Sequence, residues 1–152
     1  MTDDLDRLIR DLPKFDASAR VGIFGDEHAE EAVHLLWAEF GTVRGEPARP
    51  TLTAAFDSQV GRTADLMRDG AVALLDGKVR DGKAALDPVA FRLAEVHRSH
   101  VLSNTPPPLK PATLANRRRR GNTSTATLVD SKAMLKAIAH EVKDGGDGWP
   151  TT

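Results

Sequence analysis

The chain has 152 residues, enough for one compact domain with a hydrophobic core and too few for two domains of ordinary size. Hydrophobic residues make up 40% of it and charged residues 28%, which excludes a membrane protein and a wholly disordered chain. Lys and Arg together number 21 and Asp and Glu 22, so the overall charge argues against a protein dedicated to nucleic-acid binding.

Cysteine is absent, which excludes disulfide bonds, thiolate zinc sites, iron–sulfur clusters and a cysteine nucleophile. The first residues are acidic, whereas a secretory signal begins with basic residues and continues with an apolar stretch. No run of the sequence approaches the ~18 apolar residues needed to cross a bilayer. We therefore expect a cytoplasmic protein without a membrane partner, unless it joins a particle that leaves the cell.

Two short elements are predicted near the N-terminus. Apolar residues at helical spacing predict an amphipathic helix over residues 5–12, and Pro13 ends it because the residue before a proline avoids the α region. Residues 21–25 form a β-branched and aromatic run bounded by glycine, which predicts a strand.

The next helix is predicted from Asp26, which would cap its start, to Gly41, which would take a left-handed conformation at its end. Because an apolar stripe on a helix usually faces a core, we expect Trp37 and Phe40 to be largely buried, and Trp37→Ala to cost ~3–5 kcal/mol. The stripe at the i, i+3, i+4 and i+7 spacing consists of Val33, Leu36, Trp37 and Phe40.

Residues 47–50 contain two prolines and are predicted to form a rigid, extended entry to a long helix that begins near Thr53. Arg49 lies between these prolines, and we expect its guanidinium to point at a carboxylate or at helix-end carbonyls. Gly61 and Gly70 fall inside the long helix, where each weakens it by ~1 kcal/mol relative to Ala. Either they permit close backbone approach or the helix is simply weak.

A further helix is predicted from Asp87, an N-cap residue followed by a proline at the first helical position, to about Leu102. Its apolar face would contain Val89, Leu93, Val96 and His100.

The 27 residues from Ser103 to Val129 contain no acid, and Lys110 with four arginines gives them a charge of +5. This segment is predicted to be an extended arm that is mobile in the isolated subunit and becomes ordered on assembly. Its expected contact points are Leu109, Pro111 and Leu114, with Arg117, Arg118, Arg119 and Arg120 reaching an acidic patch on a neighbouring subunit or passing DNA.

Residues 130–142 repeat every four as in a helix and also alternate as in a strand, so the period does not distinguish the two. Residues 143–152 are predicted to be a flexible tail with a late tryptophan, Trp149, that either docks on a neighbour or stays in solvent. We therefore expect a single domain over residues 1–142.

No strong catalytic or metal-binding pattern is present. His28, Glu31 and His34 are spaced three apart, but the two histidines are six apart rather than the usual four, which favours a solvated helix face over a zinc site. His97 and His100 form a similarly weak pair. Because no nucleophile motif, phosphate loop or paired carboxylates accompany them, we predict no enzyme, no cofactor and no metal.

Two separated stretches of the sequence resemble one family, the tail-completion or virion morphogenesis proteins of long-tailed phages and Mu-like prophages. The first stretch resembles the helix end and proline clamp of that family and reads Trp37-Ala-Glu-Phe40-Gly41-Thr, followed by Pro47-Ala-Arg49-Pro50. The second resembles its carboxy-terminal pattern and reads Pro107-Pro-Leu109-Lys-Pro111-Ala-Thr-Leu114-Ala, then basic residues, then Leu128-Val-Asp130-Ser and Met134-Leu-Lys-Ala-Ile138. Thr51 stands where the family usually has an aromatic residue, and Ser131-Lys132 replaces its usual Thr-Gly.

The resemblance implies a structural virion protein that is not an enzyme. Subunits of this family assemble into a ring at the head–tail junction, so the implied partners are other copies of the chain, with a hexamer as one option, the tail tube and the head connector. The implied location is the virion neck or tail end, with assembly in the host cytoplasm. The alternatives are a nucleic-acid-binding accessory protein that uses residues 117–120 and, more distantly, a metal hydrolase that uses His28, Glu31 and His34.

The predicted fold is α+β. A small, mostly antiparallel sheet would include residues 21–24 and 138–142, covered by one long helix and two or three shorter helices. An extended arm rich in Pro and Arg would leave this domain over residues 103–129.

Overall fold

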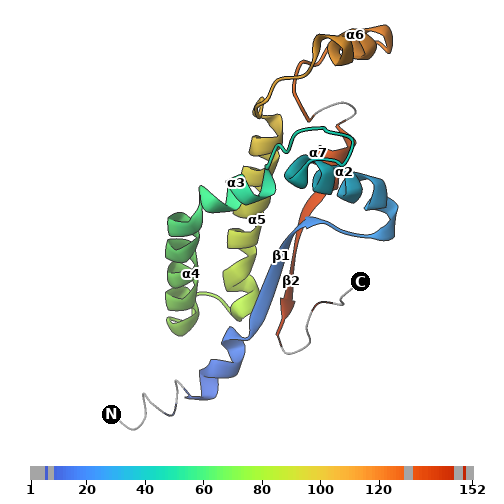
Figure 1. The fold of residues 1–152 in the computed structure, drawn as a ribbon. Coiled ribbons are helices and arrows are strands. Elements are labelled where there is room, and N and C mark those ends of the chain that lie inside the picture. The colour runs from blue at the N-terminus through green and yellow to red at the C-terminus, as the bar shows by residue number, and fades with distance from the viewer. Residues whose placement is uncertain (1–5, 7–8, 129–131, 146–148, 150–152) are drawn as a thin grey trace. The chain divides into compact units, whose positions relative to one another are not determined.

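The computed structural model describes residues 6, 9–128, 132–145 and 149. Its fold is α+β, with a two-stranded antiparallel sheet packed against one long helix and shorter helices, which confirms the predicted class (Figure 1). The elements in chain order are η1 (Leu12–Phe15), β1 (Ala17–Ile23), η2 (Asp26–His28), α2 (Ala29–Phe40), α3 (Leu52–Asp57), α4 (Val60–Leu75), α5 (Gly82–Leu102), α6 (Pro111–Arg119), α7 (Ala133–Ala137) and β2 (Ile138–Asp144).

The chain divides into two compact units. Unit 1 comprises residues 1–21, 59–92 and 140–152, and unit 2 comprises residues 22–58 and 93–139. Three of the four boundaries fall within β1, α5 and β2, so each of these elements contributes residues to both units, and the fourth lies between Ser58 and Gln59.

The N-terminal predictions are only partly covered by the described residues. Of the helix expected over residues 5–12, residue 6 and residues 9–11 are described and helical, and η1 follows. The expected strand is β1, but it begins four residues earlier than predicted, at Ala17. The alternation of apolar and polar residues that marks a strand is weak there, because Ala17, Ser18 and Ala19 are small residues that differ little in hydropathy.

The long helix expected after Thr53 is two helices, α3 and α4, separated by Ser58 and Gln59. The hydroxyl of Ser58 donates a hydrogen bond to the carbonyl of Ala55 at 2.8 Å, which helps to end α3. Ser58 keeps helical backbone angles, whereas Gln59 has a φ of −116° and lies outside the helical region, so the helical path is interrupted at this residue.

The start predicted for α5 is wrong, because the helix begins at Gly82 rather than after Asp87. Asp81 supplies the cap: its carboxylate accepts the backbone N–H of Ala84 at 2.8 Å. Pro88 consequently lies inside the helix. A proline six residues into a helix removes one backbone hydrogen bond, and the Asp-Pro pair imitates a start signal where none is used.

The two glycines of α4 have different roles. A Cβ at Gly70 would lie 3.0 Å from the carbonyl oxygen of Ala85, so α4 and α5 approach closely within unit 1 at this point. A Cβ at Gly61 would meet nothing within 4 Å. Gly70 therefore permits close packing, whereas Gly61 only weakens its helix.

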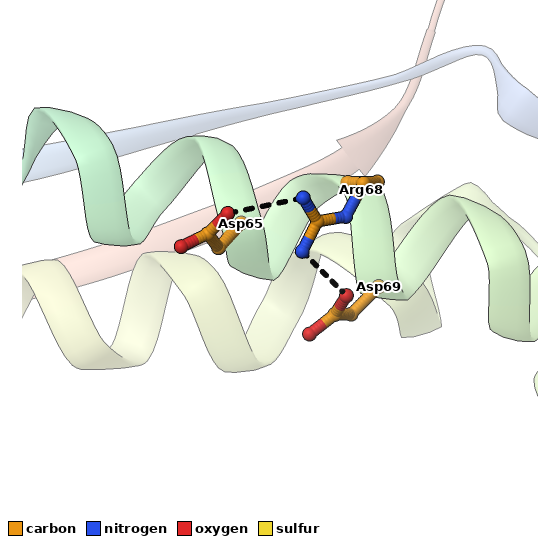
Figure 2. Close-up of polar contacts among 3 residues, drawn as sticks. All are labelled: Asp65, Arg68 and Asp69. Atoms are coloured by element: carbon orange, nitrogen blue, oxygen red, sulfur yellow. Dashed lines mark hydrogen bonds and ion pairs between the residues drawn. The ribbon is translucent and has the colours of Figure 1, made fainter.

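Part of the exposed surface of α4 carries ion pairs. Figure 2 shows the guanidinium of Arg68 between two carboxylates, with Nη1 3.2 Å from Asp65 and Nη2 3.4 Å from Asp69. All three side chains are more than half exposed. Exposed pairs of this kind contribute about 0–1 kcal/mol, so they mark a solvated helix face.

The face of α5 that is buried differs from the predicted one. Of the four residues expected there, Val89 is buried and the other three are half-buried. The buried positions recur in steps of four and three from Ala90, which are equally helical but use small and polar side chains. They are Val89, Ala90, Ala94, His97 and Val101.

The C-terminal region contains both structures that its sequence allows, α7 followed directly by β2. Ile138, at the junction, is fully buried. Trp149 lies against its own chain in unit 1, with the guanidinium carbon of Arg20 4.3 Å and the ammonium of Lys143 4.7 Å from its ring centre. Asp130 lies outside the described residues.

Candidate functional site

The apolar stripe of α2, formed by Val33, Leu36, Trp37 and Phe40, faces outward. The exposed fractions of these four residues are 41%, 55%, 51% and 77% in that order, so the prediction that Trp37 and Phe40 are largely buried is wrong. The helix itself and its end are as predicted, since Gly41 has a φ of 76° and donates its N–H to the carbonyl of Trp37. The stripe is therefore a surface feature of α2, and Trp37→Ala should cost about 1 kcal/mol or less.

The inward face of α2 consists of Leu35, Ala38 and Glu39, and α2 packs against α7 in unit 2. The chain that follows α2 folds back against this face, where the N–H of Arg49 donates to the carbonyl of Ala38 at 2.6 Å. A small residue is required where two backbones come this close. The start of α2 differs from the predicted one. The helix begins after η2, and its N-cap position is occupied by His28 rather than by Asp26.

Glu39 caps the start of α3 although it belongs to α2. Its carboxylate accepts the N–H groups of Thr51 at 2.9 Å, Leu52 at 3.1 Å and Thr53 at 2.9 Å. Burial raises the pKa of Glu39, but the hydrogen bonds from these three residues outweigh burial and lower it below its ordinary value. No sequence pattern indicates this cap, because capping motifs join residues three apart and not residues in different helices.

His97 lies beside this cap and is fully buried. Its Nε2 is 3.4 Å from the hydroxyl of Thr51, and its Nδ1 has no hydrogen-bond partner within the described residues. Burial lowers the pKa of His97 to about 4. The histidine is therefore neutral at pH 7. Thr51, also fully buried, fills the position where the family resemblance expects an aromatic residue.

Arg49 connects the proline clamp to the acid-free segment. Residues 46–50 are neither helix nor strand, as predicted, and Arg49 is only 9% exposed. Its Nε donates to the carbonyl of Pro107 at 2.9 Å. The expectation of a carboxylate or helix-end carbonyls is therefore corrected: the acceptor is a carbonyl in the triple-proline turn. Pro47 and Pro50 themselves are exposed.

The acid-free segment contains a helix, α6, where an extended arm was predicted. Its Arg117 is 6% exposed and donates to the carbonyls of Ala126 at 2.7 Å and Thr127 at 3.3 Å. Arg117 therefore holds the following loop, which corrects its assignment to a partner-binding group of four arginines. Arg118, Arg119 and Arg120 are exposed, Leu109 and Leu114 are half-buried and Pro111 is exposed.

An open cavity of about 420 Å³ lies beside α2 in unit 2. Glu31 and His34 line it, but His28 does not, so the structure brings only two of the three candidate zinc ligands to one hollow. Within the described part of the chain, no three His, Asp or Glu side chains gather closely enough to hold a metal ion. Leu128 and Met134, from the carboxy-terminal motif, also line the cavity.

No family model, curated protein or solved structure matches this chain significantly. Among the helices that the structure describes, none combines the length and the hydropathy needed to span a bilayer.

Proposed function

We propose that this chain is a structural virion protein, a subunit of a ring at the head–tail junction that completes or terminates a phage tail and helps to join it to the head. One observation carries the proposal: the large apolar side chains of α2, including Trp37 at 51% and Phe40 at 77% exposure, form a stripe on the surface of a single copy. The motif resemblance supplies the class of assembly. The partners would be other copies of the chain, the tail tube and the head connector.

The exposed stripe favours an assembly role because of its composition. Single exposed apolar residues are ordinary on protein surfaces, but adjacent large ones on one helix face mark interaction sites. Trp and Phe are also among the residues that are enriched at protein interfaces. A helix with a well-packed inner face and an apolar outer face is thus suited to a subunit whose outer face is covered by a neighbour.

Self-association is the first test. Light scattering after size exclusion should show a discrete oligomer, and electron microscopy should show closed rings. The double variant Trp37→Ala/Phe40→Ala should remain folded but elute as smaller species, because it removes apolar surface that only assembly buries. Val60→Ala/Met67→Ala is the matched control, since those residues are 66% and 52% exposed on α4. A wild-type protein that stays monomeric at all concentrations would overturn the proposal.

The biological test is deletion of the gene from a phage that encodes this chain. Particles without stable tails are expected, and particles with normal tails would contradict the function. Complementation by the wild-type chain, but not by the Trp37→Ala/Phe40→Ala variant, would connect the phenotype to the stripe.

A second function, non-specific nucleic-acid binding, is favoured by one observation: Arg118, Arg119 and Arg120 are exposed in a segment without acids. Phosphate contacts release counterions, so retention on DNA should fall steeply with salt and disappear when the three arginines are replaced by alanine. Retention that is equal for this variant and the wild type would exclude this function for α6.

A further inference from the structure

Two segments of unit 2 carry equal and opposite charges. Residues 22–43 contain five acids and no Lys or Arg, whereas residues 103–128 contain five cations and no acid. Charges in this chain are otherwise mixed, as in the exposed ion pairs of Arg68 with Asp65 and Asp69. The segregation therefore concerns two particular surfaces.

In each segment, one charged side chain is buried in the folded chain. Glu39 is 8% exposed and caps α3, and Arg117 is 6% exposed and holds its own loop. Four acids and four cations of these segments are exposed or half-buried. None of the four acids forms an ion pair with a residue that the structure describes. The acids are Asp26, Glu27, Glu30 and Glu31, and the cations are Lys110, Arg118, Arg119 and Arg120.

Glu30 and Glu31 belong to α2, and Asp26 and Glu27 lie in η2, directly before it. Glu31 precedes the buried Leu35 by four residues and therefore lies toward the inward face. Glu30 precedes Val33 by three residues, about one turn, so its side chain lies beside the stripe rather than on the buried face. The stripe also presents Trp37, whose ring face attracts a guanidinium. This surface therefore fits a partner that combines apolar contacts with several cations.

The surface of α6 has that chemistry. The helix has nine residues, of which only Arg117 is buried and Leu114 half-buried. Helices shorter than about 12 residues are marginal in isolation, so α6 depends on its polar anchor at Arg117 and gains from any further contact. Two exposed alanines and one exposed proline lie on it with the exposed arginines.

We infer that α6 of one copy docks on the apolar stripe of the next copy's α2, beside the acids at the start of that helix. The inference rests on the proposed function, in which copies form a ring. The two surfaces are different, so the contact is head-to-tail, and such contacts generate rings when the rotation between copies closes. Opposite charges would orient the contact and the apolar stripe would supply its buried area.

Two charge-reversal variants test the inference: Arg118→Glu/Arg119→Glu in α6, and Glu27→Lys/Glu30→Lys at the start of α2. Each alone places like charges at every contact, so self-association should weaken by about tenfold or more. Mixed in equal amounts, they should assemble again, because in an alternating ring each contact pairs opposite charges. Rescue in the mixture also shows that both variants are folded. Arg62→Glu/Arg68→Glu on α4 changes the net charge equally and should assemble as the wild type does.

The outcomes separate the two claims. If the wild type assembles and both reversals assemble equally well, the docking is wrong while the ring stands. If each reversal is monomeric and folded by circular dichroism but the mixture stays monomeric, the charges do not meet each other and the docking is again wrong. If the wild type itself never assembles, the proposed function fails first.

Discussion

α2 and α5 are both amphipathic helices that bury a few apolar residues and one polar residue and leave other large apolar residues at the surface, Phe91 and Leu102 in α5 at 52% and 57% exposure, but they differ in how completely the buried residues are covered. α5 buries alanines, valines and His97, and every one of these residues is 3% exposed or less. α2 buries Leu35, Ala38 and Glu39 and leaves its largest apolar residues outside.

In both helices, close backbone approach and not hydrophobicity alone decides which face is buried. At Ala38 the returning chain comes within 2.6 Å of the α2 backbone, and at Gly70 a Cβ would lie 3.0 Å from the carbonyl of Ala85 in α5. Bulky side chains do not fit at such contacts. In α2 they consequently occupy the opposite face, which makes that face apolar and suited to a neighbouring copy.

The largest expected effect comes from two adjacent leucines. Leu35 is 8% exposed and Leu36 is 55% exposed. Leu35→Ala should lower the free energy of unfolding by about 3 kcal/mol, whereas Leu36→Ala should lower it by about 0.5 kcal/mol or less. Urea denaturation at a dilution where the chain is monomeric measures both. Equal losses for the two variants would mean that α2 does not have one buried and one open face.

The next effect concerns the polar residue that α2 buries. Glu39→Gln should lower the free energy of unfolding by about 2 kcal/mol, because it replaces charge-assisted bonds to three backbone N–H groups with weaker ones. Glu30→Gln, at an exposed position of the same helix, is the control and should change stability by about 0.5 kcal/mol or less. If the Glu39→Gln protein is as stable as the control, the cap that Glu39 forms on α3 does not stabilise the chain.

The buried His97 of α5 predicts that the free energy of unfolding depends on pH. The pKa of His97 is about 4 in the folded chain and about 6.5 when unfolded, so between these values the unfolded state binds more protons. Stability is therefore full above pH 6.5 and falls as the pH drops, by about 1 kcal/mol from pH 6 to pH 5.

A variant without His97 measures how much this histidine contributes to the pH dependence of unfolding. His97→Gln should flatten the pH dependence of unfolding between pH 6.5 and about pH 4, because it removes the group whose pKa burial lowers. The lowered pKa of Glu39 acts in the same direction, but its stabilisation is lost only as the pH falls below the ordinary glutamate value. Identical profiles for the wild type and His97→Gln would contradict a neutral, buried His97.

The smallest effect distinguishes the two glycines of α4. Gly61→Ala should stabilise the chain by about 0.7 kcal/mol, because nothing lies within 4 Å of the new methyl group and the helix gains propensity. Gly70→Ala should lose this gain, since its methyl group would lie 3.0 Å from the Ala85 carbonyl. Thermal unfolding of the two proteins side by side measures the difference, and an equal gain at both positions would refute the close approach of α4 and α5.

The sequence by itself determined the α+β class, the end of α2 at Gly41 and the apolar stripe as a set of residues. These features depend on local properties: periodicity, the conformational freedom of glycine and the restriction of proline. Local signals failed where two of them competed, as at Asp87-Pro88, which imitates a helix start although Asp81 provides the cap.

Only the tertiary structure decided which way the stripe faces, because periodicity identifies a helix face without naming its partner. It also decided that Glu39 caps α3 and that Arg49 and Arg117 bind backbone carbonyls, since these contacts join residues 12, 58 and 9 positions apart along the chain. Hydrogen bonds of this reach depend on where the backbone returns in space, and a sequence pattern extends over only a few turns.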